Sequence, residues 1–279
     1  MTDQSSKKQS KKRKKKGKKK QSGHRVPEGY DASNYPTFAV TVDVVIMSVV
    51  DGQLMVLLVR RQADPYEGAW ALPGGFKHPD ESLDAAAFRE LREETGVDAP
   101  KHLAQFGAYG DPGRDPRGNV VTVAYLAVTP EVGRIEAGTD ADDARLWPLG
   151  DVLDGGLDLA FDHDRILCDA VERARDQLEG SDLATAFVGP TFTLSELQSV
   201  YEAIWDDELD TANFRRSLSM TPPDSSYVVS TGERAAAGPK GGRPPELFSA
   251  GDAWSDGSPV RRSKRRTPES KSGRRKETP

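Results

Sequence analysis

The stretch GGFKHPDESLDAAAFRELREETGV, from Gly74 to Val97, decides the fold of this chain. Apolar residues recur at every fourth position through its second half. Because residues four apart lie on one face of a helix, this spacing predicts an amphipathic helix over about residues 82 to 95. Gly96 stands where such a helix normally ends. The predicted apolar stripe comprises Leu83, Ala87 and Leu91, with Phe88 widening it.

Three glutamates are expected to crowd onto one face of this helix. Glu90, Glu93 and Glu94 are spaced i, i+3 and i+4. Like charges at this spacing repel, so a site that gathers them needs a cation. Hard divalent cations such as Mg²⁺ or Mn²⁺ take oxygen ligands, and Mg²⁺ pairs carboxylates with substrate phosphates. Arg89 precedes Glu93 by four residues and can orient its carboxylate. The alternative is a solvated, charge-rich helix without a ligand.

The segment resembles the Nudix box, GX5EX7REUXEEXGU, at every fixed position. This resemblance implies an α/β Nudix fold, an α/β/α sandwich around a mixed sheet. It also implies cleavage of a nucleoside diphosphate linked to another group, by metal-activated water. The site residues that it implies are Glu90, Glu93 and Glu94 as catalytic metal ligands, the Gly75 carbonyl as a further ligand, and Arg89 as the orienting residue.

The remaining pattern up to residue 180 predicts strands and one more long helix. Residues 37–61 form two β-branched runs around Asp51-Gly52, which predicts a hairpin. Residues 60–75 are expected to form a loop that Trp70 anchors. Further strands are predicted at 106–108, 120–128 and 145–149, and a helix at 159–178. We expect His163 near that helix start to cap it or face solvent, and Cys168 to pack on its apolar stripe.

Four residues outside the box are candidates for substrate binding. In the Nudix segment that this chain resembles, an arginine at the strand end before the box can meet phosphates, which favours Arg60 or Arg61. Arg114 and its neighbour Arg117 lie on a turn-rich loop that could close over a substrate. In many Nudix hydrolases a later loop supplies a carboxylate as base or ligand, and Asp142 is the candidate here, beside Asp140 and Asp143.

Residues 181–250 predict a small winged helix-turn-helix domain. Thr193 to Glu196 is a capping box that opens one helix, and Asp210 can cap a second. Strand-like residues 227–230 and 247–248 flank a basic loop, which suggests a wing. The alternative is a helical hairpin that merely packs on the first domain. The candidate DNA-binding residues are Asn213, Arg215 and Arg216 on the second helix, and Lys240 and Arg243 on the wing.

Charge is segregated along the 279 residues. Residues 1–25 carry 12 Lys/Arg and one acid, residues 256–279 carry nine and three, and the remainder carries 18 and 40. We therefore expect disordered basic tails at 1–34 and 251–279, around a Nudix domain at 35–180 and the DNA-binding domain at 181–250. The tails are expected either to bind polyanions such as nucleic acid or only to keep the protein in solution. Cys168 alone excludes an intrachain disulfide, and no apolar run predicts a membrane span, so we expect a cytoplasmic protein.

The order of motifs along the chain indicates a family more specifically than either domain does alone. The motifs TVDVVI, WALPGGF, LAFDHDRIL, FTLSELQSVYEAI, NFRRSL and GRPPELF resemble the Nudix-related transcriptional regulators of NAD metabolism. The resemblance implies a bacterial, nucleoid-associated homodimer that senses ADP-ribose or a related nucleotide and binds double-stranded operator DNA. In that family the Nudix box is often eroded, whereas here it is complete. A plain ADP-ribose pyrophosphatase with a C-terminal domain for oligomerisation is the alternative, and RNA association through the tails a third.

Overall fold

The computed structural model describes residues 27–97, 100–130, 141–219, 226–236, 243–252 and 258–262. The chain separates into two units, residues 1–37 and residues 38–279. In the first unit, the described residues form a short 3-10 turn, Ala32–Asn34, and the rings of Tyr30 and Tyr35 stack 5.9 Å apart. Most of both predicted basic tails lies outside the described residues.

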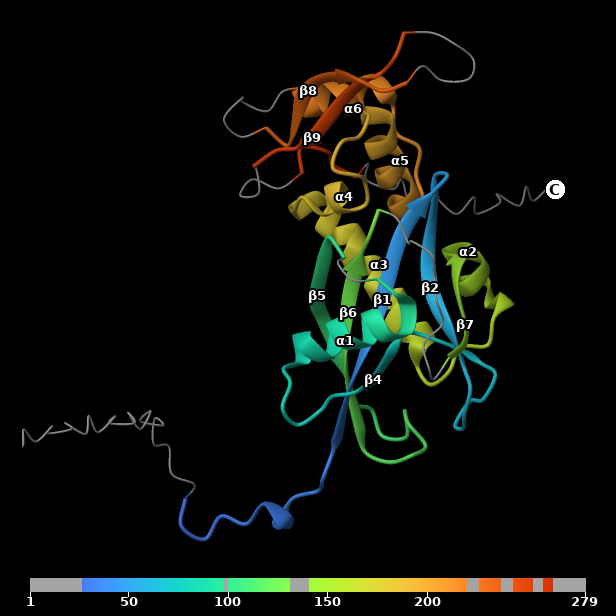
Figure 1. The fold of residues 1–279 in the computed structure, drawn as a ribbon, viewed down its shortest axis with the longest axis vertical. Coiled ribbons are helices and arrows are strands. Elements are labelled where there is room, and N and C mark those ends of the chain that lie inside the picture. The colour runs from blue at the N-terminus through green and yellow to red at the C-terminus, as the bar shows by residue number, and fades with distance from the viewer. Residues whose placement is uncertain are drawn as a thin grey trace, which may run out of the picture. The chain divides into compact units, whose positions relative to one another are not determined.

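A mixed sheet of seven strands organises the described part of the second unit (Figure 1). The strands are β1 (Ala39–Val50), β2 (Gln53–Arg61), β3 (Trp70–Ala71), β4 (Gly74–Phe76), β5 (His102–Tyr109), β6 (Val120–Val128) and β7 (Ala141–Pro148). The main path is β3-β2-β1-β6-β5, with β4 paired to β1 and β7 paired to β2. β1 and β6 run parallel and the other pairs antiparallel, which confirms the predicted mixed sheet.

The β1–β2 hairpin forms at the predicted Asp-Gly pair. Val50 pairs with Gln53 across the turn. Asp51 has φ 50° and Gly52 has φ 76°, so both central residues are left-handed. Two-residue hairpin turns need this conformation, and Asp-Gly adopts it with little strain.

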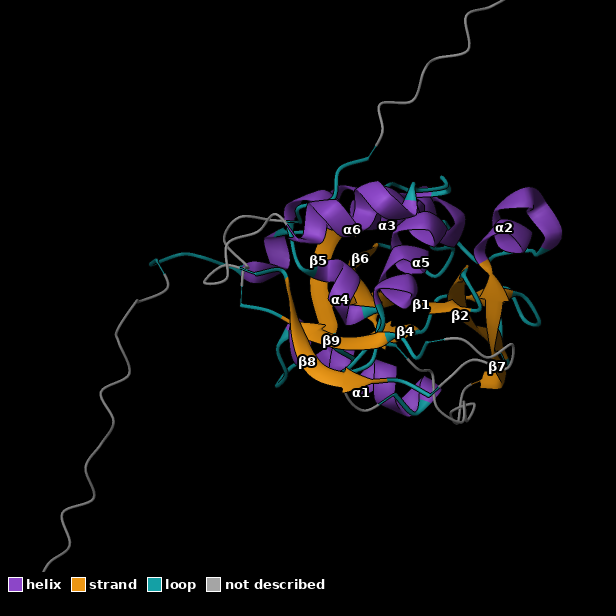
Figure 2. Ribbon diagram, turned by 90° about the horizontal axis from the view of Figure 1, so that it is seen from above, coloured by secondary structure: helices purple, strands orange, loops and turns teal. Residues whose placement is uncertain are grey.

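Helices cover both faces of the sheet. Seen from above, α1 (Leu83–Thr95) lies on one side, and α3 (His163–Gly180) and α5 (Leu194–Trp205) lie on the other (Figure 2). β1 is buried from residue 41 to residue 48, and its side chains alternate between two apolar clusters. One cluster joins β1 to α1, and the other joins β1 to α3 and α5. The chain therefore has the three layers of the predicted α/β/α sandwich.

The helix of the opening stretch forms at the predicted place. The Ser82 side chain caps α1, and Gly96 ends it at φ 71°. Ala87 and Leu91 are buried, as the stripe predicts. Phe88 is a correction, because its side chain is 46% exposed. The buried face is instead completed on its other flank, where Ala86 lies in the apolar cluster.

The long helix starts four residues later than predicted. Trp70 on β3 exchanges backbone hydrogen bonds with residues 158 and 160, which keeps the preceding segment extended. α3 therefore begins at His163. Cys168 is exposed, so its expected packing is wrong. The buried face runs through Ile166, Ala170 and Ala174, and position 168 lies on the opposite side of the helix.

The C-terminal part has the predicted helices and strand pair. The capping box of Thr193 and Glu196 opens α5, and the side chain of Asp210 accepts a hydrogen bond from Asn213 N at the start of α6 (Thr211–Ser219). β8 (Val228–Arg234) and β9 (Glu246–Ala250) pair antiparallel as the wing. The short helical segments before them are α2 (Leu149–Asp151), Val152–Gly156 and α4 (Leu183–Ala186).

A single apolar cluster joins the Nudix-like sheet to the C-terminal helices. It extends from Met47 on β1 through α3 to Trp205 on α5 and Phe214 on α6. Arg175 of α3 donates to the Ile204 carbonyl at 2.8 Å, and the Trp205 indole donates back to the Arg175 carbonyl at 3.2 Å. α3 thus contacts both halves of the unit. Within the described ranges, no helix is long and apolar enough to cross a membrane.

Candidate active site

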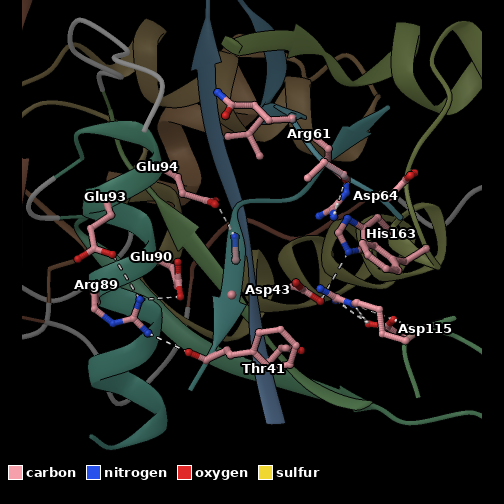
Figure 3. Close-up of a pocket in the computed structure, with 18 of the residues that line it drawn as sticks. Thr41, Asp43, Arg61, Asp64, Arg89, Glu90, Glu93, Glu94, Asp115 and His163 are labelled. Atoms are coloured by element: carbon pink, nitrogen blue, oxygen red, sulfur yellow. Dashed lines mark hydrogen bonds and ion pairs between the residues drawn. The ribbon is translucent and has the colours of Figure 1, made fainter. Parts of the chain in front are cut away.

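A cavity of about 710 Å³ lies beside α1, with β1 crossing between its two walls (Figure 3). The α1 wall carries Arg89 and the three glutamates of the opening stretch. Gly74, Gly75 and Asp43 also line the cavity, and Gly74 is paired with Asp43 where β4 meets β1. The opposite wall comes from the end of β2, the loop before β6 and the start of α3. Its polar and aromatic residues include Arg61, Asp64, Arg114, Asp115, Arg117, Phe161 and His163.

Arg89 organises the α1 wall. Its guanidinium donates to Glu81 at 2.8 Å, to Glu90 at 2.7 Å and to Glu93 at 3.4 Å. It also donates to the Phe76 carbonyl at 3.1 Å. The hydrogen bonds from Arg89 lower the pKa of Glu81 to about 2, so this carboxylate stays ionised at neutral pH. The Arg89 guanidinium therefore fixes the positions of three carboxylates, among them that of Glu93, which the sequence predicts it to orient.

Glu90 is the most deeply placed of the three glutamates, at 7% exposed. Burial raises the pKa of its carboxyl above the usual value, and the hydrogen bond from Arg89 offsets only part of that rise. The carboxylate packs directly on the backbone of Gly75. A buried carboxylate with this environment is stabilised by additional positive charge.

Gly75→Ala is expected to displace Glu90. The added Cβ would lie closer than 3.0 Å to three carboxyl atoms of Glu90, so the Glu90 carboxylate must leave its present position. We expect affinity for Mg²⁺ to fall roughly tenfold or more, since a 1 Å misplacement of a site group can cost ~100-fold in function. Calorimetric titration with Mg²⁺ measures this. The control is Gly150→Ala, whose Cβ meets nothing within 4 Å; an equal loss there would contradict the explanation.

The donor set suits a hard divalent cation. Glu94 accepts a hydrogen bond from Gly74 N at 2.8 Å, and the Glu93 side chain is 52% exposed and can turn. Carboxylate and carbonyl oxygens are the ligands that Mg²⁺ prefers. Within the described residues, however, no three His, Cys, Asp or Glu side chains are gathered closely enough to hold an ion. Arg89 and Gly74 N engage carboxylate oxygens instead.

His163 is a cavity residue that sequence reasoning missed. The sequence predicts that it caps α3 or faces solvent, but its side chain is only 3% exposed. Its Nδ1 accepts a hydrogen bond from Leu72 N at 2.9 Å, and its Nε2 lies 3.7 Å from the Asp43 carboxylate. Burial lowers the pKa of His163, which favours the neutral ring that this acceptor role requires. Its partner Leu72 is 91 residues away, so no local pattern indicates the contact.

Arg114 lines the cavity, but its side chain is not free on a closing loop. It is 5% exposed, donates to Asp162 at 2.6 Å and lies 3.6 Å from Asp43. The neighbouring Arg117 is held by Asp115 at 2.7 Å. The loop of residues 110–119 is therefore attached to the start of α3 by buried charge, and three of its residues line the cavity.

The two predicted strand-end arginines have different surroundings. Arg61 lines the cavity and donates to the carbonyls of Pro65 and Ala63. Arg60 is not among the cavity-lining residues; its Nε donates to the Gly68 carbonyl at 3.1 Å. Asp142 belongs to β7, but its side chain lies outside the described residues, as does Asp140. Asp143 is in register with Arg60 and pairs with Arg145.

The candidate DNA-binding residues of α6 share an exposed face. Asn213, Arg215 and Arg216 are exposed, whereas Phe214 and Leu218 are buried. Arg216 donates to the side-chain oxygen of Asn213. On the wing, Arg243 is exposed just before β9, and Lys240 lies outside the described residues. The described part of α6 therefore presents two arginines and an asparagine to solvent.

Two segments of the chain match known domain models. Residues 37–169 match the NUDIX domain, and residues 185–250 match the NrtR DNA-binding winged helix domain. An Acinetobacter baylyi protein named "ADPR responsive transcriptional repressor NtrR" is 38% identical over 221 residues, which cover 78% of this chain and 84% of the relative. The chain belongs to the NrtR family.

Known proteins resemble both the Nudix part and the winged-helix part of this NrtR-family chain. The crystal structure of Shewanella oneidensis NrtR complexed with a 27mer DNA is similar, with a TM-score of 0.65 and 34% identity over 76% of this chain and 93% of that one. An ADP-ribose pyrophosphatase of Methanocaldococcus jannaschii is 37% identical over 131 residues, covering 47% of this chain and 72% of the relative. Hydrolysis is thus an activity of the wider Nudix family, whose hydrolases generally use divalent metal ions.

Proposed function

We propose that this NrtR-family protein is a transcriptional repressor whose cavity binds ADP-ribose or a related NAD-derived nucleoside diphosphate. Occupancy of the cavity then lowers its affinity for operator DNA. The observation that carries this proposal is the joining of a glutamate-lined cavity and a winged helix by one apolar cluster and one helix, α3. The names of the Acinetobacter baylyi and Shewanella oneidensis relatives support it.

In this proposal α6 is the recognition helix. Arginine and asparagine side chains can make paired hydrogen bonds to guanine and adenine in the major groove, which suits Arg215, Arg216 and Asn213. Lys240 and Arg243 of the wing would contact phosphates, which set orientation more than sequence preference. Helix-turn-helix regulators commonly bind as dimers to two half-sites, so we propose a homodimer acting on DNA in the bacterial cytoplasm.

The cavity is proposed to retain metal-dependent pyrophosphohydrolase activity. Glu90, Glu93, Glu94 and the Gly75 carbonyl would hold Mg²⁺ or Mn²⁺. When bound, the metal would supply activated water and neutralise phosphate charge. The chain's own residues then have defined tasks: Arg89 orients Glu90 and Glu93, and Arg61 offers positive charge across the cavity. Asp142, which the sequence places on a loop but which lies at the start of β7, remains a proposed carboxylate for this site.

A plain nucleoside-diphosphate pyrophosphatase is the second candidate. The complete set of box glutamates favours it, because a pure sensor does not need all of them. In that case the C-terminal domain would serve oligomerisation, and the exposed arginines of α6 would have no nucleic-acid partner. The two candidates differ in whether the chain binds a specific DNA sequence.

A gel-shift with promoter DNA tests the proposal. We expect a sequence-specific complex that ADP-ribose dissociates, and Arg216→Ala should weaken it roughly 5- to 150-fold, equivalent to about 1–3 kcal/mol, through lost base contacts. ADP-ribose hydrolysis should stay unchanged, because α6 does not line the cavity. The matched control is Arg173→Ala, an exposed arginine on α3. Failure to observe any specific complex at physiological salt would leave the pyrophosphatase candidate.

A further inference from the structure

A short segment that follows the wing in sequence lies against the C-terminal ends of α3 and α5. This segment is SPVRR, residues 258–262, and we call it the C-terminal strap. Ser258 is 0% exposed, and Val260 is 5% exposed and belongs to the apolar cluster that joins the sheet to the C-terminal helices. The strap lies outside both matched domain models, which end at residues 169 and 250.

The helices α3 and α5 end without cations of their own. The last carbonyls of a helix have no partner within it, and the helix dipole places partial negative charge there, so a nearby cation stabilises the end. Both helices lie wholly within the described ranges, and neither has a basic residue in its last turn. The last turn of α3 instead contains Glu179, whose charge has the unfavourable sign. Both ends therefore need positive charge from another segment.

The strap supplies this charge through two adjacent arginines. The Arg261 guanidinium donates to the Glu179 carbonyl at the end of α3. The Arg262 guanidinium donates to the Trp205 carbonyl at the end of α5, at 3.4 Å. The backbone N–H of Arg262 donates to the Glu179 carboxylate at 2.8 Å, which places both guanidinium groups. One dipeptide of the strap thus caps two helices and connects their ends.

The first residue of the strap completes a row of buried hydroxyl groups. Ser258 Oγ lies 2.7 Å from the hydroxyl of Tyr201 on α5, which donates to the Tyr227 hydroxyl at 3.0 Å. Tyr227, just before β8, donates in turn to the Ser181 carbonyl just after α3, at 3.5 Å. Buried polar groups that lose a partner are destabilised. The strap therefore contributes to contacts among α3, α5 and the start of the wing.

The position of α5 determines that of the exposed arginines of α6. The Gln198 side chain on α5 donates to the Leu209 carbonyl at 2.9 Å and to the Thr211 hydroxyl at 3.2 Å, which attaches the start of α6 to α5. The ring of Phe214 on α6 packs on Tyr201 of α5, with 5.7 Å between centroids. A segment that fixes α5 on α3 therefore also fixes α6.

We propose that the C-terminal strap is a conformational device that holds α5 and α6 on the end of α3 in the position that DNA binding requires. This rests on the proposed function, in which α6 is the recognition helix. Undocking of the strap lowers DNA affinity and leaves ligand binding in the cavity unchanged, because no strap residue lines the cavity.

Val260→Asp in the full chain tests the strap, because a buried carboxylate without a partner should undock this segment. We expect hydrogen exchange, followed by mass spectrometry, to become tenfold faster or more in the peptides that contain the last turns of α3 and α5. Affinity for a promoter fragment that the parent shifts should fall tenfold or more, whereas calorimetric ADP-ribose affinity should stay within threefold. Val260→Ile keeps the apolar contact and should match the parent. The control is Val50→Asp, an exposed valine at the end of β1 that adds the same charge and should also match the parent.

If Val260→Asp does not fold, the double variant Arg261→Ala/Arg262→Ala gives the test. Arg261 is exposed and Arg262 half-buried, so the fold should tolerate their loss. The same increase in exchange and the same loss of promoter affinity are expected. The control is Arg92→Ala/Arg173→Ala, which removes the same charge at two exposed arginines and should keep promoter affinity within threefold.

Three results would overturn the strap. They are unchanged exchange at both helix ends, faster exchange with promoter affinity within threefold of the parent, and a loss of ADP-ribose affinity as large as the loss of promoter affinity. The exchange measurement needs no ligand. Absence of any specific DNA complex with the parent would therefore refute the proposed function and the strap's role in it, whereas exchange alone decides whether the strap caps the two helices.

Discussion

Glu94→Gln is expected to lower Mg²⁺-dependent ADP-ribose hydrolysis by roughly 10²–10³-fold, the loss typical when one preorganised charged or polar group is removed from a site. Glu94 lies on the α1 wall and is fixed by the hydrogen bond from Gly74 N at 2.8 Å. Glutamine preserves size and one carbonyl oxygen but removes the negative charge that a divalent cation needs. Release of AMP from ADP-ribose at saturating Mg²⁺, followed by chromatography, gives the comparison with the parent chain.

The control for this change is Glu172→Gln, an exposed glutamate on α3. Its hydrolysis should match the parent, and both variants should keep the parent's melting temperature and DNA affinity. Equal turnover in Glu94→Gln, or no turnover in the parent, would remove the catalytic claim. If the variant still binds ADP-ribose, the DNA should remain released for longer, because the effector is no longer consumed.

Trp205→Ala is expected to lower the free energy of unfolding by about 3–5 kcal/mol, the usual cost of removing a buried tryptophan. Trp205 is fully buried, packs 5.0 Å from Tyr201 and donates to the Arg175 carbonyl. It lies in the apolar cluster that joins α3 and the sheet to α5 and α6. The void that the alanine leaves therefore removes packing contacts from the sheet and α3 as well as from α5 and α6. Urea unfolding followed by far-UV circular dichroism measures the loss.

Val229→Ala provides the comparison, since Val229 is 46% exposed on β8 and should cost less than about 0.5 kcal/mol. Because the cluster is continuous, the parent should unfold in one transition that moves as a whole in Trp205→Ala. Two separate transitions, with the one assigned to the sheet unmoved by the substitution, would show that the halves are energetically independent.

The parts of the structure that sequence predicted are those that depend on neighbouring residues. The Asp51-Gly52 turn, the Ser82 and Thr193 caps and the Gly96 helix end each involve contacts within a few residues. The glutamate spacing likewise places three carboxylates on α1 without knowledge of the rest of the fold. These features follow from short-range geometry, so the pattern sufficed.

The opposite wall depends on long-range contacts and could not be predicted in the same way. His163 reaches Leu72 across 91 residues, and Arg114 reaches Asp162 across 48. Arg60 and Arg61 are adjacent, so they point to opposite faces of β2, and only the pairing of β2 with its neighbours decides which one enters the cavity.

The continuity of α3 has a mechanical consequence. Its 18 residues run from His163 at the cavity to Gly180, where Glu179 accepts a hydrogen bond from Arg262 N. A straight helix of this length is about 27 Å long, so a tilt of about 3° at the cavity end would displace the far end by roughly 1.4 Å. If α3 moves as a rigid body, a small movement around His163 would therefore displace α5 and α6. The displacement would be large enough to break a hydrogen bond between α6 and DNA. DNA release would then not require any loss of contacts between the sheet and the C-terminal helices.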